Sequence, residues 1–361
     1  MVKKSFVGTF LLLAGIGITA CNPPLPPELQ AELADRNINC GSAPVSVYAP
    51  ASLAPIFDQW SFEYTELCPA SGVSEIIQDE TVQTDLVLST SSEAPSSCNS
   101  YLTVPVMANA TVLAISLQGL DGLILDPEAF AKILNGEITS WDDPSIVALN
   151  PQFEAISIPV NLSTTISKAD AEAIDSWLSR VAPDSWSGWP TSFSITDQGF
   201  DENNPPQQIF EDGGLSFVPF SFASINSLQS IQLKVESNSD AVPSSLDNIA
   251  SGVSQLTLES KSSPAISTLD ASREPLPVEG FDVPLAPWQA IVPVYVHSCE
   301  GGSESDVRSL IRFMLRTNSQ SSLVNYAFFG IPAEMRGSVI ELVSQGLPSP
   351  SPIEPETAAT P

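Results

Sequence analysis

The chain has 361 residues, 43% of them hydrophobic, which is enough apolar material for two lobes of ordinary size and excludes wholesale disorder. Its 13 Lys and Arg residues face 42 Asp and Glu residues, and the formal net charge is −29. Nucleic-acid binding requires basic side chains that meet phosphates, so this acidity argues against a nucleic-acid partner and against adhesion to anionic lipid headgroups. It favours an exported protein kept soluble by its charge.

The first twenty residues have the pattern of an export signal. Lys3 and Lys4 precede an apolar run that is short for a membrane span and that ends on Ile18-Thr19-Ala20-Cys21, which resembles a bacterial lipobox. We expect residues 1–20 to be a lipoprotein signal peptide and Cys21 to carry the lipid that anchors the chain to the extracytoplasmic face of a bacterial membrane. The alternative is an ordinary signal peptide followed by a chance cysteine.

Four further cysteines remain for disulfide bonds, namely Cys40, Cys68, Cys98 and Cys299. In an exported chain they predict two disulfides, and the sequence leaves all three connectivities open. No C-x-x-C pair is present, and His297 is the only histidine. We therefore expect no metal site and no cofactor, and a structural or surface role for His297.

Strand and helix signals alternate from the start of the body. A strand is predicted at 45–48, followed by a helix that Ser52 caps and that runs to Leu67. A second strand is predicted at 84–89, before a serine-rich turn. The long β-branched run from Val104 to Leu117 predicts a strand that crosses between lobes.

Later helices are predicted from their caps and strands from their apolar runs. Helices should begin at Asp126 (ending at Gly136), Asp143, Ser167 (168–181), Ser245 (to Leu256), Ser303 (to Asn318) and Pro332 (to Gly346), and strands should lie at 156–162, 215–220, 231–235 and 290–296. This alternation predicts an α/β fold with mainly parallel sheets, whose ligands lie at strand ends against helix N-termini. Residues 21–42 are Pro-rich and predict a tether, and 347–361 predict a disordered tail.

The stretch ILNGEITSWDDPSIVALNP (133–151) resembles a segment of the phosphate-binding proteins of phosphate ABC transporters. The matching residues are Gly136, Ile138, Trp141, Asp143, Pro144, Ile146, Leu149, Asn150 and Pro151. Residues 51–60, 215–223 and 329–335 are similar to other segments of that family in the same order, so that the resemblance covers about residues 43–346.

The resemblance implies a two-lobed periplasmic binding protein type II fold with a ligand cleft at the hinge. Lobe 1 would be 43–110 plus 286–346, and lobe 2 would be 111–285. It also implies a monomeric solute-binding protein without enzymatic activity, which captures phosphate or another oxyanion and delivers it to an ABC permease. A hydrolase would need His297 as a base, and no nucleophile-elbow motif accompanies it.

The family's binding residues map onto this sequence only in part. The resemblance places the ligand near Ser52, Leu53, Thr90, Ser91, Glu93, Thr164, Thr165, Ser167 and Lys168, and either Thr90 or Glu93 occupies the position of the family's proton-accepting Asp. Thr164 stands where the family has an Arg that binds phosphate in a bidentate manner, and the Gly-Ser-Gly turn is missing from 73–81. These departures leave open a non-transport surface lipoprotein that keeps the fold without binding phosphate.

Overall fold

The computed structural model describes residues 40–77, 79, 81–117, 122–153, 157–260, 262–278, 280–345 and 347. The expected signal peptide (1–20), the lipidation site Cys21, the tether up to residue 39 and the tail from residue 348 lie outside the described residues, as does Gly346. No helix within the described part is long and apolar enough to cross a membrane.

A seven-stranded sheet runs through the molecule in the order β2-β1-β3-β14-β4-β9-β6. Its strands are β1 (Val45–Tyr48), β2 (Val73–Ile77), β3 (Leu86–Ser89), β4 (Ser100–Ser116), β6 (Asn161–Leu162), β9 (Gly214–Pro219) and β14 (Ile291–Cys299). Three smaller sheets are formed by β5 (Ile124–Leu125), β10 (Gln232–Lys234) and β11 (Ala241–Val242), by β7 (Thr165–Ser167) and β8 (Ser194–Thr196), and by β12 (Leu256–Leu258) and β13 (Ser267–Leu269).

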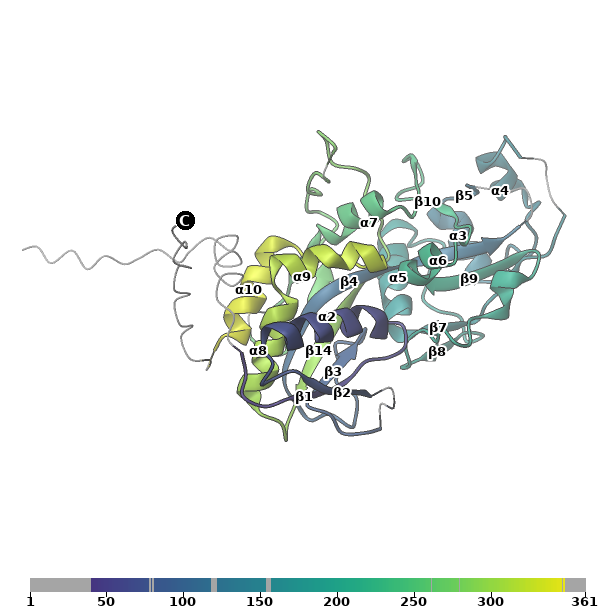
Figure 1. Ribbon diagram of the computed structural model, residues 1–361. Helices are drawn as coiled ribbons and strands as arrows, with labels where there is room; N and C mark the ends of the chain where they lie inside the picture. The colour runs from purple at the N-terminus through teal and green to yellow at the C-terminus, as the bar shows by residue number, and fades with distance from the viewer. Residues whose placement is uncertain are drawn as a thin grey trace, which may run out of the picture.

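Helices flank the large sheet in two groups (Figure 1). The helices are α2 (Ala54–Leu67), α3 (Pro127–Leu134), α4 (Pro144–Leu149), α5 (Lys168–Val181), α6 (Phe220–Ile225), α7 (Leu246–Val253), α8 (Glu304–Met314), α9 (Thr317–Ser322) and α10 (Ala333–Val343), with 3-10 turns η1 (Gln207–Phe210) and η2 (Leu323–Tyr326). In Figure 1, α2, α8, α9 and α10 lie at one end and α3, α4 and α6 at the other. The expected two-lobed α/β fold is confirmed.

Strand pairing in the large sheet is mixed. The outer pairs β1–β2, β1–β3 and β6–β9 are parallel, as expected of strands joined through helices. The central pairs β3–β14, β14–β4 and β4–β9 are antiparallel. The two long strands β4 and β14 therefore run against each other, an arrangement that an element order alone does not specify.

β4 belongs to both halves of the large sheet. Its residues 100–110 pair with β14 and its residues 111–116 pair with β9, so that its partner on the chain changes between Ala110 and Thr111. All residues from 102 to 115 are buried. This explains why the sequence shows a mostly apolar run instead of an alternating one, as is typical of a strand covered on both faces.

Helix starts follow their predicted caps where a side chain accepts a backbone amide. The side chains of Asp126, Ser167 and Ser245 each accept a hydrogen bond from the backbone amide of the residue three positions later. The Asp143 side chain accepts from the amide of Ser145. Ser52 is not a cap: α2 begins one residue later, with Leu53 at the N-cap, because the amides of Leu53 and Ala54 both donate to the Pro50 carbonyl.

Two other predicted elements end early. The helix expected from Ser303 to Asn318 stops at Met314, because Arg316 adopts an extended backbone and starts the separate helix α9. The helix expected to reach Leu256 stops at Val253, and Leu256 instead opens β12. Of the strand expected at 156–162, residue 156 lies outside the described residues and only Asn161–Leu162 pairs as a strand.

The stretch that carries the family resemblance is scaffold. Asn150 accepts the amide of Ile124 at 2.8 Å and donates to the carbonyls of Ile124 and Ile146 at 2.8 Å, which fixes α4 against β5. Trp141 is buried and donates from its indole nitrogen to the Gly213 carbonyl at 3.0 Å. Gly136 has φ of +74°, a left-handed conformation that glycine adopts without strain after a helix.

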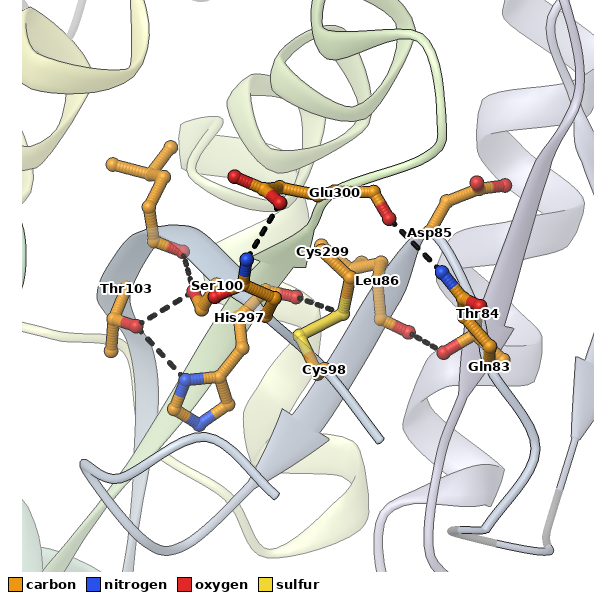
Figure 2. The surroundings of a disulfide bond; sticks show 12 residues. Gln83, Thr84, Asp85, Leu86, Cys98, Ser100, Thr103, His297, Cys299 and Glu300 are labelled. Atoms are coloured by element: carbon orange, nitrogen blue, oxygen red, sulfur yellow. Dashed lines mark hydrogen bonds between the residues drawn. A yellow bond between two sulfur atoms is a disulfide. The ribbon is translucent and has the colours of Figure 1, made fainter. Parts of the chain in front are cut away.

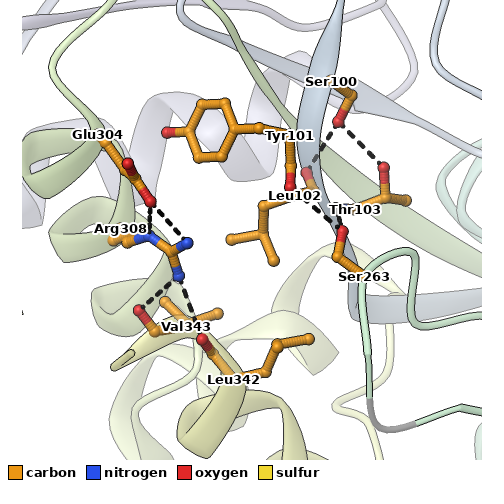
Figure 3. A network of polar contacts seen from close by, with 9 residues as sticks. All are labelled: Ser100, Tyr101, Leu102, Thr103, Ser263, Glu304, Arg308, Leu342 and Val343. Carbon is orange, nitrogen blue, oxygen red and sulfur yellow. Dashed lines mark hydrogen bonds and ion pairs between the residues drawn. The ribbon is translucent and has the colours of Figure 1, made fainter. Parts of the chain in front are cut away.

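Covalent and polar contacts tie distant segments of the first half-sheet together. The four cysteines form the disulfides Cys40–Cys68 and Cys98–Cys299, which settles the connectivity. Arg308 on α8 donates to the carbonyls of Leu342 and Val343 at 3.1 Å, and so caps the C-terminal end of α10 (Figure 3).

Candidate functional site

Four of the predicted ligand residues surround one narrow cavity. Ser52 and Leu53 come from the turn before α2, Thr90 from the loop after β3, and Ser167 from the start of α5. The cavity has a volume of about 30 Å³, which corresponds to roughly two water molecules. Its other walls are Asn109, Ala110, Asp170, Phe200, Pro219, Val292 and Val294. The cavity thus lies where β4 changes its strand partner.

The α5 end of the cavity is a reciprocal cap. The Ser167 hydroxyl accepts the Asp170 amide at 3.2 Å and donates its own hydrogen to the Asp170 carboxylate. The hydroxyl of Thr111 on β4 donates to the other carboxylate oxygen. Asp170 keeps some accessible surface because it faces the cavity, but the surrounding protein desolvates the carboxyl and raises its pKa.

The α2 end of the cavity offers fewer donors than the sequence predicts. The Leu53 amide donates to the Pro50 carbonyl at 2.9 Å, so the Leu53 side chain lines the cavity while its N–H group is already used. The hydroxyls of Ser52 and Thr90 make no side-chain hydrogen bond to any described residue.

Lys168 and Glu93 bind each other. The Lys168 ammonium lies 2.9 Å from the Glu93 carboxylate, and the side chains are 36% and 78% exposed. This contact and the nearby charge raise the pKa of Lys168. The pair joins the N-terminus of α5 to the loop after β3, outside the walls of the narrow cavity. As an exposed pair it contributes roughly 0–1 kcal/mol to stability.

A larger polar cavity of about 660 Å³ adjoins the narrow one and shares Ser52 and Thr90 with it. Its further lining residues include Tyr48, Ser89, Ser91, Glu93, Ser96, Ser97 and Asp197. Ser89 and Ser91 accept the amides of the residues two positions onward at 3.0 and 3.1 Å, so their oxygens mainly shape the loop. Among the described residues that line these two cavities there is no Lys or Arg.

Thr164 and Thr165 lie away from both cavities. Both are exposed, and Thr165 belongs to β7, which pairs only with β8. Ile166 is buried in the core, and because side chains alternate along a strand, Thr165 faces the opposite side. The structure therefore does not bring these two hydroxyls to the other candidate residues.

His297 contacts the loop after β3 through the Ser91 carbonyl. The ring has no exposed surface, and its Nε2 donates to the Ser91 carbonyl at 3.1 Å. Its Nδ1 accepts from the Thr103 hydroxyl at 3.0 Å (Figure 2). Burial lowers the pKa of His297 to about 4. The disulfide Cys98–Cys299 lies next to it and joins the end of the same loop to β14.

Sequence reasoning missed the two other polar residues of the narrow cavity, Asn109 and Asp170, together with its five further apolar residues. Asn109 is buried, donates to the Ser221 hydroxyl at 2.9 Å and accepts the Ala110 amide at 2.8 Å. The sequence feature that could have identified Asn109 is its position as a polar residue within a mostly apolar strand. The signal of Asp170 is an acid at the third position of a capped helix, which suggests only a cap. Within the described residues no group of three or more His, Cys, Asp or Glu residues could hold a metal ion.

Comparisons with known proteins agree with this geometry. A family model described as a PBP superfamily domain matches residues 70–261. The phosphate-binding protein PstS2 of Mycobacterium bovis BCG is 20% identical over 310 residues, which are 80% of this chain and 83% of the relative. Phosphate-binding protein PstS 3 of Mycobacterium tuberculosis H37Rv is 22% identical over 252 residues, 67% of this chain and 65% of the relative's length.

Solved structures show the same fold. The ancestral soluble variant of the human phosphate binding protein superposes with a TM-score of 0.54 at 11% identity, and the match covers 82% of this chain and 93% of that one. The expected resemblance to phosphate-binding proteins of ABC transporters is confirmed by these relatives. The chain therefore belongs to the PBP superfamily and is similar, within it, to the phosphate-binding proteins.

Proposed function

We propose that this chain is an extracytoplasmic solute-binding lipoprotein of the phosphate ABC transporter type, which captures a small anion or polar solute by closure of two lobes. The observation that carries the proposal is the cavity between the start of α2, the loop after β3 and the start of α5. Segments far apart in sequence meet there around hydroxyl groups, at the junction of the two halves of the sheet.

We propose residues 43–110 plus 286–346 as lobe 1 and residues 111–285 as lobe 2. The exchange of strand partner between Ala110 and Thr111 supports this boundary. The Lys168–Glu93 ion pair then joins the two proposed lobes at 2.9 Å, and the narrow cavity lies below it. Both features fit a closed arrangement around a small solute.

Ligand titration tests the proposal. The full chain in detergent is titrated with phosphate, arsenate, sulfate and a set of neutral polar solutes, while thermal unfolding and small-angle scattering are recorded. A ligand present at about 100 times its Kd should add roughly 2.7 kcal/mol to the free energy of unfolding and reduce the radius of gyration. If no solute in the set changes either quantity, the capture function is refuted.

The lipid anchor, the permease partner and the monomeric state belong to the same proposal. Lipidation of Cys21 would keep the protein at the extracytoplasmic membrane face beside an ABC permease. In a bacterial host, Cys21→Ala should move the protein from the membrane fraction to the soluble fraction. An unchanged membrane fraction would remove the anchor from the proposal while leaving solute binding intact.

Binding without catalysis is also proposed. Both ring nitrogens of His297 are engaged, by the Thr103 hydroxyl and the Ser91 carbonyl, and neither His297 nor Thr103 lines the two cavities. Esterase and phosphatase assays should therefore give the same background for the natural chain and for His297→Ala. Activity that this substitution abolishes would contradict a pure binding function.

One observation favours a second candidate, a surface lipoprotein that keeps the fold without transport. The described residues lining both cavities include no Lys or Arg, and the Leu53 amide is already donated to Pro50. A charge-assisted hydrogen bond contributes roughly 1.5–3 kcal/mol, so phosphate loses much of its usual binding energy in such a site. This candidate predicts that the same titration finds no ligand at all while the protein remains folded.

A further inference from the structure

The N-terminal end of α5 is a place where a protein can bind an anion, and here the protein's own Asp170 carboxylate occupies it. Each hydroxyl group has a single hydrogen to donate. The hydrogens of Ser167 and Thr111 both go to the Asp170 carboxylate, one to each oxygen. The Asp170 amide goes to Ser167 at 3.2 Å. These three donors are therefore not available to a ligand in the cavity.

The charges around the two joined cavities also disfavour a bound anion. Asp170 lines the narrow cavity, and Glu93 and Asp197 line the larger one. The Lys168 ammonium lies 2.9 Å from Glu93, and its charge is balanced by that carboxylate. An incoming oxyanion would thus meet carboxylates that no cation balances, and the repulsion would be strongest in the narrow, mainly apolar cavity beside Asp170.

The remaining groups suit an uncharged solute. Ser52 and Thr90 have hydroxyls without a described partner, and both lie on the wall that the two cavities share. The Asp170 oxygens each have acceptor capacity beyond the hydroxyl they bind. The rest of the narrow wall is formed by Asn109, whose amide group binds Ser221 and Ala110, and by Leu53, Phe200 and other apolar side chains. This set offers acceptors and hydroxyls to a ligand, and no positive charge.

We propose that Asp170 determines the specificity of this site: its carboxylate occupies the anion position at α5, so that the cavity rejects phosphate and other oxyanions and takes a small uncharged solute that donates hydroxyl or amide hydrogens. This inference rests on the proposed capture function and specifies its ligand class. Asp170 acts on the ligand directly, through the carboxylate that faces the narrow cavity.

Charge removal at this one position provides the test. Asp170→Asn keeps the size of the side chain and can still accept a hydroxyl hydrogen, but it frees at least one hydroxyl and removes the negative charge. Glu172→Gln is the matched control, because it removes the same charge from an exposed residue of the same helix, two residues away. Calorimetric titration of the full chain in detergent with sodium sulfate and sodium phosphate reads out the result.

We expect sulfate and phosphate to bind the natural chain and Glu172→Gln only weakly, with a Kd above about 1 mM, and to bind Asp170→Asn roughly 100-fold more tightly. Myo-inositol and glycerol represent the neutral class and should lose affinity in Asp170→Asn, because the carboxylate is the stronger acceptor. Thermal unfolding confirms that each variant is folded, and Asp170→Ser serves in place of an Asn variant that does not fold.

Two results would overturn the inference, and they have different consequences for the capture function. Tight binding of sulfate or phosphate by the natural chain refutes the role of Asp170 while it upholds solute capture. Anion binding that is unchanged in the folded Asp170 variant also refutes the role of Asp170, and the titrations with neutral solutes then show whether the chain captures a solute at all.

Discussion

Acidification should destabilise this protein through its one histidine. His297 is fully buried, donates from Nε2 to the Ser91 carbonyl and accepts at Nδ1 from the Thr103 hydroxyl. The neutral ring satisfies both contacts, whereas a protonated ring keeps the Thr103 contact only if the hydroxyl turns to accept, and it places a positive charge in the core. Burial lowers the pKa of His297 from its ordinary value of 6.5 to about 4. Protonation must therefore bury a positive charge and reverse the direction of the Thr103 contact.

The sign and size of the effect follow from linkage between protonation and folding. Since the pKa is lower in the folded chain, the stabilisation is complete above 6.5, the value in the unfolded chain, and is lost as the pH falls toward about 4. The free energy of unfolding should decrease by about 2 kcal/mol at about pH 5 and by about 3 kcal/mol at about pH 4 through this group alone.

Urea unfolding between about pH 7.5 and pH 4.5 measures this loss, with His297→Gln as the control. Glutamine can donate to Ser91 and accept from Thr103, but it does not titrate, so the difference between the two proteins isolates the histidine from Asp170 and other groups. Because the chain has a single histidine, its ring NMR signals give the folded pKa without ambiguity. A ring that titrates near 6.5, or parallel stability losses in both proteins, would refute the reasoning.

Three further changes should have distinct effects on stability. Gly252→Ala should lower the free energy of unfolding by roughly 1–3 kcal/mol in urea, because the new methyl group would lie 2.1 Å from the Trp288 carbonyl oxygen; an unchanged midpoint would show that α7 can shift freely. The double variant Cys98→Ala/Cys299→Ala opens a link between residues 201 positions apart and should cost about 2–5 kcal/mol in the same assay; a smaller loss would mean that the unfolded chain is hardly restricted by that link. Lys168→Gln should change stability by less than about 1 kcal/mol, and a larger change in thermal unfolding would mean that its exposed ion pair is not screened by water.

Local signals in the sequence predicted those elements that local interactions determine. Asp126, Ser167 and Ser245 cap helices as expected, because a cap involves residues only three positions apart. The break at Arg316 was not predictable in this way, since no proline or glycine marks it and the extended backbone there begins a new helix.

The candidate site depends on contacts over much longer distances. Ser52, Thr90 and Ser167 were named from family resemblance, and the structure gathers them around one cavity; their binding role stays a prediction. The bond from Thr111 to Asp170 spans 59 positions and joins β4 to α5, so a single sequence gives no sign of it. From the sequence alone, the place of Asp170 three positions after Ser167 suggests only a role in the helix cap.

The 17-residue strand β4 also determines which contacts separate when the two proposed lobes open. If the two proposed lobes rotate about β4, the strand that they share, atoms farther from β4 move farther. Thr111 and Asp170 lie beside the point where β4 changes partner, while the Lys168–Glu93 pair lies out at the rim. A rotation of one proposed lobe against the other would separate Lys168 from Glu93, since they belong to different lobes, and would leave Thr111 beside Asp170, since these belong to the same lobe; a distance probe across the Lys168–Glu93 pair would therefore report opening.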